Sequence, residues 1–396
     1  MLLCYTILGE RRMLVMAYKR VYLDNSATTS ISKEVLETIK PFLKEYYYNP
    51  SAAYQDTNVI RTAINQARTE VAIALNCDSE EIFFTSGGTE SDNWALQGML
   101  RNEKYNKLLT SEIEHPAVYN TAQALGDMGY EVYYTRTKSN GIIDIDDFEQ
   151  IMFQKTPNLI SIMLANNETG AIQPIKKVIE YAKFYQSYVH TDAVQAMGHM
   201  KVDVKELGVD LLSLSGHKFH APKGIGVLYV KKGTPLQNLM YGGKQEHKLR
   251  PGTENVVGII GIAKAITIAT QKLDTNIKRM KQLRDLLQNT LQENISEMNI
   301  NGDIERRLPN ILNVSFRGIP GVTMVTLLDL EGISVSSGSA CSTTATITPS
   351  RILQAMGKTA EEAEEGIRFS LSPETTEEEI QYTIQKVIHI VNNIKQ

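Results

Sequence analysis

A lysine follows closely on one of the apolar segments of the chain. The run 210–214 has the composition of a buried strand, and Ser215, His217 and Lys218 come within four residues of its end. Most lysines are solvated surface groups. A lysine at the mouth of a parallel sheet is instead well placed as a Schiff-base nucleophile, because burial lowers the pKa of a lysine. Ser215 and His217 could then donate hydrogen bonds to a nearby phosphate.

An aspartate occupies the equivalent place on another apolar segment. Asp192 ends the run that begins at Ser187, and Gln195 follows it. A single aspartate at a strand end is more often a helix cap or a solvated group. A strand that ends in an acid beside one that ends in a lysine is what pyridoxal phosphate (PLP) requires, because the acid keeps the pyridine nitrogen protonated and the lysine holds the aldehyde. The combination predicts a PLP site.

Two glycines mark a third segment of interest. The chain passes from an apolar run that ends at Thr85 through Gly87 and Gly88 into a helical stretch that begins near Thr89. Glycines let the backbone approach an anion, and the helix start presents free N–H groups and the positive end of the helix dipole. This segment is therefore either a phosphate cradle or an ordinary strand-to-helix turn, since a short glycine motif is weak evidence by itself.

The elements that must position these residues alternate along the chain. Between about residues 33 and 300, short apolar runs such as Glu81 to Thr85 and Leu159 to Leu164 alternate with helical stretches such as Ile175 to Gln186. Continuous apolar runs suit strands that are buried on both faces. Strands that alternate with helices predict a largely parallel α/β sheet.

A smaller α+β unit is expected in the last third of the chain. A long helical region from about Val257 to Met298 should bridge the two units. Strands are predicted at Asn310 to Phe316 and at Gly366 to Leu371. The last helix should begin near Thr376, where Glu379 completes a capping box.

Composition excludes several classes of protein. The 396 residues are 42% hydrophobic and 22% charged, which is typical of a globular chain rather than a disordered one. Lys and Arg number 41 against 45 Asp and Glu, so the basic excess of a nucleic-acid binder is missing. No apolar stretch approaches the length of a membrane span. We therefore expect no nucleic-acid partner and no membrane.

The cysteines indicate the compartment. Three occur, Cys4, Cys77 and Cys341, and such a sparse, odd count fits a reducing cytoplasm rather than a disulfide framework. No two of them have zinc-ligand spacing, so we expect no metal site. Cys77 is expected to be structural, whereas Cys341 stands in the segment from Ser334 to Ser350, which is built almost wholly from small residues and should be a mobile loop.

At this point several motifs resemble those of one family, the cysteine desulfurases. The matching stretches occur in the family's order from about residue 20 to the C-terminus, so the resemblance covers nearly the whole chain. They are Tyr22–Thr29, Thr85–Glu90, Asn166–Gly170, Ser215–Gly226, Arg250–Asn255 and Ser336–Ser342. The Gly-Ser-Ala-Cys sequence that ends at Cys341 resembles the nitrogen-fixation and iron–sulfur-cluster branch. The resemblance implies the aspartate-aminotransferase-like fold (PLP fold type I) and a homodimer with active sites at the subunit boundary.

The resemblance also implies roles for individual residues. Lys218 would hold the aldehyde of PLP, Asp192 would pair with its pyridine nitrogen, and Gln195 would contact its ring hydroxyl. His115 would stack on the ring and assist proton transfer, although a lone histidine is more often structural. The phosphate would be held by Gly88, Thr89, Ser215, His217 and, from the partner subunit, Thr253.

Two further residues match groups that bind the carboxylate of the substrate, Asn167 and Arg368. Cys341 matches the family's nucleophile. Its thiolate would attack the sulfur of L-cysteine, which leaves a persulfide on Cys341 and releases alanine. A sulfur-acceptor protein would then take the sulfur, for iron–sulfur clusters, thiolated tRNA or thio-cofactors.

Some positions depart from the family pattern. Tyr54 and Thr57 stand where the family usually has histidine and glycine, and Lys244 stands where glycine is common. Two other functions stay open on the sequence: a PLP lyase or aminotransferase for another amino acid, and an idle sulfur-relay or scaffold subunit. The first gives no reason for the cysteine segment, and the second predicts the loss of a cofactor residue, which is not seen.

The domain organisation follows from these elements. Residues 1–15 form a doubtful leader, since Met16 is a candidate translation start. Residues 16–32 are expected to join the small domain. Residues 33–265 would form the large PLP-binding domain, and residues 266–396 the small α+β domain that supplies Cys341 and Arg368.

Overall fold

The computed structural model describes residues 20–338 and 349–395. The predicted leader at residues 1–15, Cys341 and most of the predicted loop around it lie outside the described residues. At the start of that segment the structure has two short strands, β11 (Ile333–Ser334) and β12 (Ser336–Ser337).

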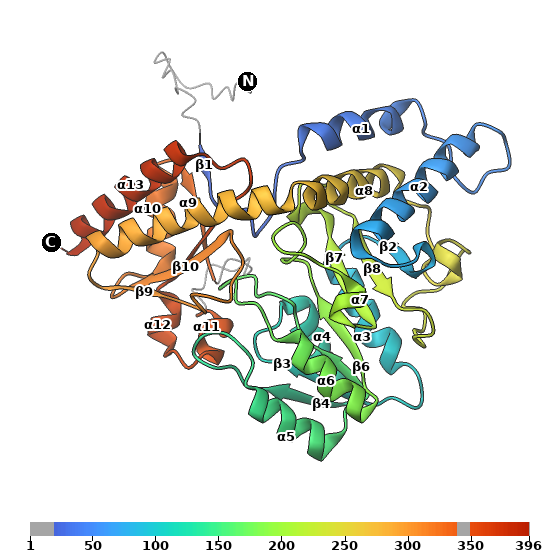
Figure 1. Ribbon diagram of the computed structural model, residues 1–396, viewed down its shortest axis with the longest axis horizontal. Coiled ribbons are helices and arrows are strands. Elements are labelled where there is room, and N and C mark those ends of the chain that lie inside the picture. The colour runs from blue at the N-terminus through green and yellow to red at the C-terminus, as the bar shows by residue number, and fades with distance from the viewer. Residues whose placement is uncertain (1–19, 339–348, 396) are drawn as a thin grey trace, which may run out of the picture.

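A seven-stranded sheet forms the centre of the large part of the molecule (Figure 1). Its strands lie in the order β2-β8-β7-β6-β5-β3-β4. The central pairs β7·β6, β6·β5, β5·β3 and β3·β4 are parallel, and only β8 runs against its two neighbours. The predicted, largely parallel α/β sheet is therefore confirmed. The strands are β2 (Ile82–Thr85), β3 (Lys107–Ser111), β4 (Glu131–Thr135), β5 (Leu159–Ser161), β6 (Tyr188–Asp192), β7 (Leu211–Ser215) and β8 (Gly226–Val230).

Each strand supplies apolar side chains to both faces of the sheet, because successive side chains point to opposite sides. Phe84 and Leu212 belong to one core, and Phe83 and Leu211 belong to the other. Burial on both faces explains why these strands read as continuous apolar runs. The helices of this part are α1 (Lys33–Lys44), α2 (Thr57–Leu75), α3 (Gly88–Leu100), α4 (Pro116–Asp127), α5 (Ile145–Lys155), α6 (Ile175–Tyr185), α7 (Val204–Leu207) and α8 (Val256–Gln271).

A second, antiparallel sheet lies in the smaller part, in the order β12-β13-β10-β9. The predicted α+β unit is thus confirmed, and its helices cover the sheet as Figure 1 shows. Thr376 and Glu379 exchange the two hydrogen bonds of the predicted capping box at the start of the last helix. The elements are β9 (Met298–Ile300), β10 (Ile311–Phe316), β13 (Gly366–Ser370), α9 (Leu273–Asn294), α10 (Gly321–Leu330), α11 (Arg351–Ala355), α12 (Ala360–Glu364) and α13 (Glu377–Lys395).

The long helical region is two helices rather than one. The axes of α8 and α9 differ by 74° at Lys272. Ile262 and Ile266 of α8 pack in the core of the large sheet, whereas Leu283 and Leu287 of α9 pack in the core of the small sheet. The bend thus arises because the two halves are buried against different sheets.

Within the described ranges, no single helix is both long enough and apolar enough to cross a membrane. Only the bent pair α8 and α9 together reach that length and composition, and most of the apolar side chains of α8 are buried.

We propose that the division of the chain at residues 33 and 266 separates two domains. The segment before α1 supports its assignment to the small part, because β1 (Val21–Tyr22) pairs in parallel with β11. In the helical region, residues up to Ile266 of α8 pack in the core of the large sheet and residues from Leu283 of α9 pack in the core of the small sheet, while Leu308 and Ile311 of the small part also pack in the large core.

Candidate active site

One cavity of about 600 Å³ lies at the carboxyl ends of the central parallel strands. Ligands of open α/β sheets bind at this edge, because the strand ends and the following helix starts converge there. Its lining includes ten of the twelve residues predicted from the sequence as site residues: Gly88, Thr89, His115, Asn167, Asp192, Gln195, Ser215, His217, Lys218 and Arg368.

Asp192 and Lys218 come from adjacent strands. Asp192 ends β6 and lies opposite Ser213 of β7, and Lys218 ends the short 3-10 helix η2 (Gly216–Lys218) that follows β7. Lys218 Nζ donates to the carbonyl oxygens of Ser26 at 2.6 Å and Ala27 at 2.9 Å. The N-terminal segment therefore holds the lysine at the edge of the cavity.

The carboxyl group of Asp192 is buried. Its Oδ1 accepts the backbone N–H of Val194 at 2.8 Å. Burial raises the pKa of Asp192 to about 6, and this hydrogen bond and the charge of Lys218 oppose the rise. A cation placed against this carboxylate would restore the ionised form.

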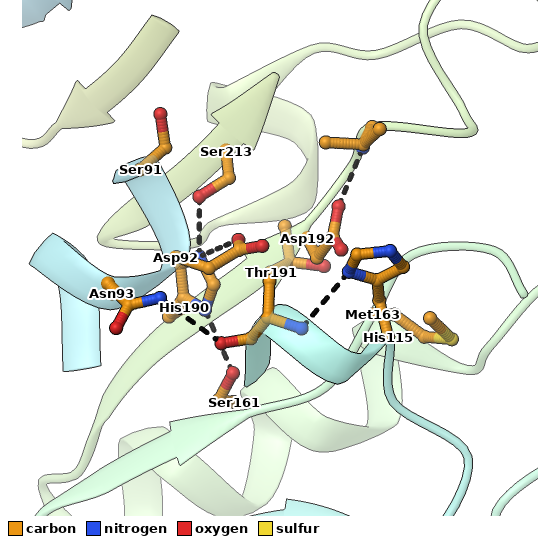
Figure 2. A network of polar contacts seen from close by, with 12 residues as sticks. Ser91, Asp92, Asn93, His115, Ser161, Met163, His190, Thr191, Asp192 and Ser213 are labelled. Atoms are coloured by element: carbon orange, nitrogen blue, oxygen red, sulfur yellow. Dashed lines mark hydrogen bonds and ion pairs between the residues drawn. The ribbon is translucent and has the colours of Figure 1, made fainter. Parts of the chain in front are cut away.

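His115 is the N-cap of α4, where its Nδ1 accepts the backbone N–H of Ala117 at 3.1 Å. Figure 2 shows its ring beside Asp192. Burial, together with the charges of Lys218, Arg351 and His217, lowers the pKa of His115 to about 4. The ring is therefore neutral at pH 7, and because Nδ1 accepts a hydrogen bond its proton is on Nε2.

The predicted glycine turn connects β2 to α3. Gly88 is the first residue of α3, and Thr89 is the second. A Cβ atom on Gly88 would lie 2.8 Å from Val194 Cγ2 and 3.4 Å from Ser215 Cβ, so no larger residue fits there without a shift. The first N–H groups of α3 and the side chains of Ser215 and His217 thus face one end of the cavity, which is an arrangement suited to an anion.

Arg368 reaches the cavity from β13 of the small sheet. Its Nη1 donates to the carbonyl oxygen of Asn167 at 2.8 Å, and its Nη2 donates to Asp24 Oδ1 at 2.7 Å. The guanidinium is buried, with 8% of the side chain exposed. Asp24 shares this edge of the cavity; it stands in the Tyr22–Thr29 motif but was not predicted as a site residue.

The two remaining predicted residues lie elsewhere. Thr253 borders a separate cavity of about 150 Å³ together with Phe84, Arg250 and Asn255. Cys341 lies outside the described residues. Cys77, predicted to be structural, packs against the core of the large sheet, and burial raises the pKa of its thiol to about 12.

Sequence reasoning missed a buried polar cluster beneath Asp192 (Figure 2). His190 is fully buried between Ser161, whose Oγ is 2.8 Å from Nδ1, and Ser213, whose Oγ is 2.9 Å from Nε2. Asp92 of α3 lies 3.6 Å from His190 Nε2 and lines the cavity. Burial and the neighbouring charge of Asp192 raise the pKa of Asp92 well above its ordinary value. A carboxylate one turn into a helix gives no signal of this position in the sequence.

Among the described residues, several buried polar atoms at the cavity have no hydrogen-bond partner. They are Ser26 Oγ, Asp92 Oδ1, Asn167 Oδ1, Gln195 Oε1 and Arg368 Nε. Buried polar groups are almost always paired. The unpaired atoms, the anion-binding end at α3 and the Asp192–Lys218 pair together fit a ligand with a phosphate, polar ring substituents and an aldehyde, as PLP has.

The fold and this site define the class of protein: an α/β enzyme of the aminotransferase type. The model of the aminotransferase class-V family matches residues 21–383. The chain is 45% identical to the cysteine desulfurase IscS of Dictyoglomus turgidum over 95% of its own length and 96% of the relative. It is 44% identical to cysteine desulfurase IscS of Clostridium botulinum, with 94% of each chain covered.

Solved structures agree. A NifS-like protein superposes with a TM-score of 0.88 at 38% identity, covering 94% of this chain and 99% of that one. A structure described as SspA in complex with cysteine superposes with a TM-score of 0.78 at 34% identity, covering 90% and 100%. The chain therefore belongs to the cysteine desulfurases of the aminotransferase class-V family, as the motifs predicted.

Proposed function

We propose that this enzyme uses PLP to convert L-cysteine to L-alanine and collects the sulfur as a persulfide on Cys341. One observation carries the proposal: Lys218 and Asp192 meet at the ends of adjacent parallel strands, in a cavity whose unpaired polar atoms fit PLP. When bound, PLP supplies the electron sink that weakens bonds at the substrate Cα.

In this proposal, different residues of the cavity contact different parts of the cofactor. Lys218 would hold the aldehyde carbon, and ionised Asp192 would pair with the protonated pyridine nitrogen. Gln195 offers the unpaired Oε1 for the ring hydroxyl, while its Nε2 is fixed by the carbonyl oxygen of Ser26 at 2.9 Å. The phosphate would lie at the N-terminus of α3, against residues Gly88, Thr89, Ser215 and His217.

The small domain would recognise the substrate carboxylate. Arg368 has a buried Nε without a partner among the described residues, and the side-chain amide of Asn167, which also lines the cavity, could donate to the same carboxylate from Nδ2. The fork of a guanidinium matches the two oxygens of a carboxylate, so lysine would be a poor replacement. Asp24 holds this guanidinium in place through its contact with Nη2.

Proton transfer would involve His115 and Lys218. Neutral His115 carries its proton on Nε2, so the ring can donate that proton and later recover one. Lys218 would take the proton from the substrate Cα once its Nζ no longer holds the aldehyde carbon of PLP. The thiolate of Cys341 would then attack the substrate sulfur: an S–S bond forms, the C–S bond breaks, and its electron pair returns to the carbon skeleton that leaves as alanine.

A second copy of this chain is part of the proposal. Thr253 lies outside the main cavity, as expected of a residue that serves the phosphate of a partner subunit. The end of α1 and the connection to α2 also expose apolar and aromatic side chains, with Leu43 at 60% and Tyr47 at 71%. We propose a cytoplasmic homodimer that hands its sulfur to an acceptor protein for iron–sulfur clusters, thiolated tRNA or thio-cofactors.

The test replaces each cysteine in turn. Cys341→Ala should abolish alanine formation from L-cysteine under reductant, while the absorbance band of bound PLP stays. Cys77→Ala is the matched control and should keep activity, because the Cys77 thiol does not ionise near neutral pH. Undiminished alanine formation by Cys341→Ala would remove the proposed nucleophile, and a PLP band with keto acid as the product would favour another amino-acid reaction.

A further inference from the structure

Arg351 reaches from the small domain across the cavity to the segment that carries His115. It is the first residue of α11, and it follows Ser350, the N-cap of that helix. Ser350 Oγ donates to buried Glu168 Oε2 at 2.5 Å. The turn from which Arg351 projects is therefore fixed independently of its own side chain.

The guanidinium of Arg351 makes three contacts with one short stretch of backbone and helix. Its Nη1 donates to the carbonyl oxygen of Glu112, and its Nη2 donates to that of Glu114. Its Cζ lies 3.8 Å from the ring centroid of Tyr119, in the first turns of α4. Arg351 therefore holds the backbone just before His115 and packs on the Tyr119 ring, which follows His115 in α4.

We propose that Arg351 is a positioning residue for His115: it fixes the backbone from which His115 projects and supplies a cation that faces the imidazole. This inference rests on the proposed function in one respect only, the role of His115 in proton transfer. Arg351 acts on the reaction through His115, so we class it as a positioning residue rather than a catalytic one. The forked contact needs a guanidinium, since a lysine ammonium is a single point of charge.

The charged groups around His115 determine the direction in which its pKa should change when Arg351 is replaced. Lys218 and His217 face it from the end of β7, Asp92 and Asp192 offer oxygens within 4.8 Å of one another and of its ring nitrogen, and Arg351 faces it from α11. Removing a neighbouring cation favours the protonated imidazole. Neutral replacements of Arg351 should therefore raise the pKa of His115, whereas lysine should leave it nearly unchanged.

The experiment titrates His115 in the PLP-loaded protein by NMR. The chain has seven histidines, so Cε1 labelling of histidine gives few signals, and His115→Gln assigns the one of interest. Arg351→Met and Arg351→Gln should both raise the midpoint by about half a pH unit or more, and Arg351→Lys should keep it. Arg307→Met is the matched control, because Arg307 is also partly buried but does not line the cavity.

A second readout tests whether Arg351 holds the backbone just before His115 through its hydrogen bonds to Glu112 and Glu114. Amide hydrogen exchange over residues 112–118 should rise in Arg351→Met and in Arg351→Lys, and should stay unchanged in Arg307→Met. Unchanged titration in both neutral variants, or unchanged exchange in the two Arg351 variants, would overturn the inference. Neither readout depends on alanine formation, so a failure of the proposed function would appear separately, in the wild-type assay.

Discussion

A buried ion pair beside β2 should make the loss of either of its partners costly to stability. Arg68 of α2 and Glu246 bind one another through two contacts, at 2.6 and 2.8 Å, with only 10% and 5% of the side chains exposed. Glu246 Oε2 also accepts the backbone N–H of Phe84 in β2 at 2.9 Å, and Arg68 lies 4.8 Å from the Phe84 ring. The pair thus fastens the segment around Glu246 to the strand that leads into α3.

Removing one partner leaves the other charge buried without compensation. Glu246→Ala would strand the Arg68 guanidinium and the N–H of Phe84, and the loss of one partner of a buried pair costs about 3–5 kcal/mol. Urea unfolding at a fixed protein concentration would measure this, because the stability of the proposed homodimer would depend on concentration. The double replacement Arg68→Met with Glu246→Leu removes both charges and should recover at least about 1 kcal/mol of the loss.

Glu37→Ala is the matched control. Glu37 pairs with Lys40 at 2.5 Å, but both side chains are more than half exposed, so the loss should be at most about 1 kcal/mol. A cost of Glu246→Ala no larger than that of Glu37→Ala would refute the reasoning. So would a double variant that is less stable than Glu246→Ala alone.

Three further changes have defined outcomes. Gly88→Ala should lower PLP affinity by about tenfold or more in a fluorescence titration, because its Cβ would meet Val194 at 2.8 Å and overpacking costs about 1–3 kcal/mol; unchanged affinity would place the anion elsewhere. Burial lowers the pKa of His190 to about 3 in the folded protein, below its ordinary value of about 6.5. Between these two pH values the unfolded chain binds a proton that the folded protein does not, so stability falls as the pH drops through this range. In urea unfolding, the free energy of unfolding of His190→Gln should depend less steeply on pH, by up to about 1.4 kcal/mol per pH unit. The same pH dependence in the variant and the wild type would contradict this assignment. Lys248→Gly should raise the melting temperature, because Lys248 has φ +70° and a strained left-handed residue costs of order 1 kcal/mol; a lower melting temperature would show that the Lys248 side chain contributes more.

Much of the site could be predicted, because it depends on the order of the strands and on residue types that stand next to strand ends in the sequence. Asp192 and Lys218 each stand at the end of an apolar run, and carboxyl ends of neighbouring parallel strands meet at one edge of a sheet. Gly88 was recognisable because a strand-to-helix turn is a local feature of the sequence. The roles of His115, Asn167 and Arg368 came from resemblance rather than from any physical pattern around them.

The parts that could not be predicted depend on contacts between distant segments. The bend at Lys272 has no proline or glycine to announce it, and it exists because α8 and α9 are buried against different sheets. Asp24 meets Arg368 only after β1 joins β11, and Asp92 meets Asp192 only when α3 packs on the sheet. No local pattern predicts these pairings, because they form only when the cores bring distant segments together.

The sequence by itself determined the class of this protein, because apolar periodicity sets the α/β layers and the motifs carry the chemistry of the family. Only the tertiary structure decided which charges face that chemistry. It placed the Arg351 guanidinium on carbonyl oxygens just before His115 and, within the described residues, left five polar atoms of the cavity without a partner. The physical reason is that pKa values and unsatisfied hydrogen bonds depend on burial and on neighbours far away in the chain, which no local pattern encodes.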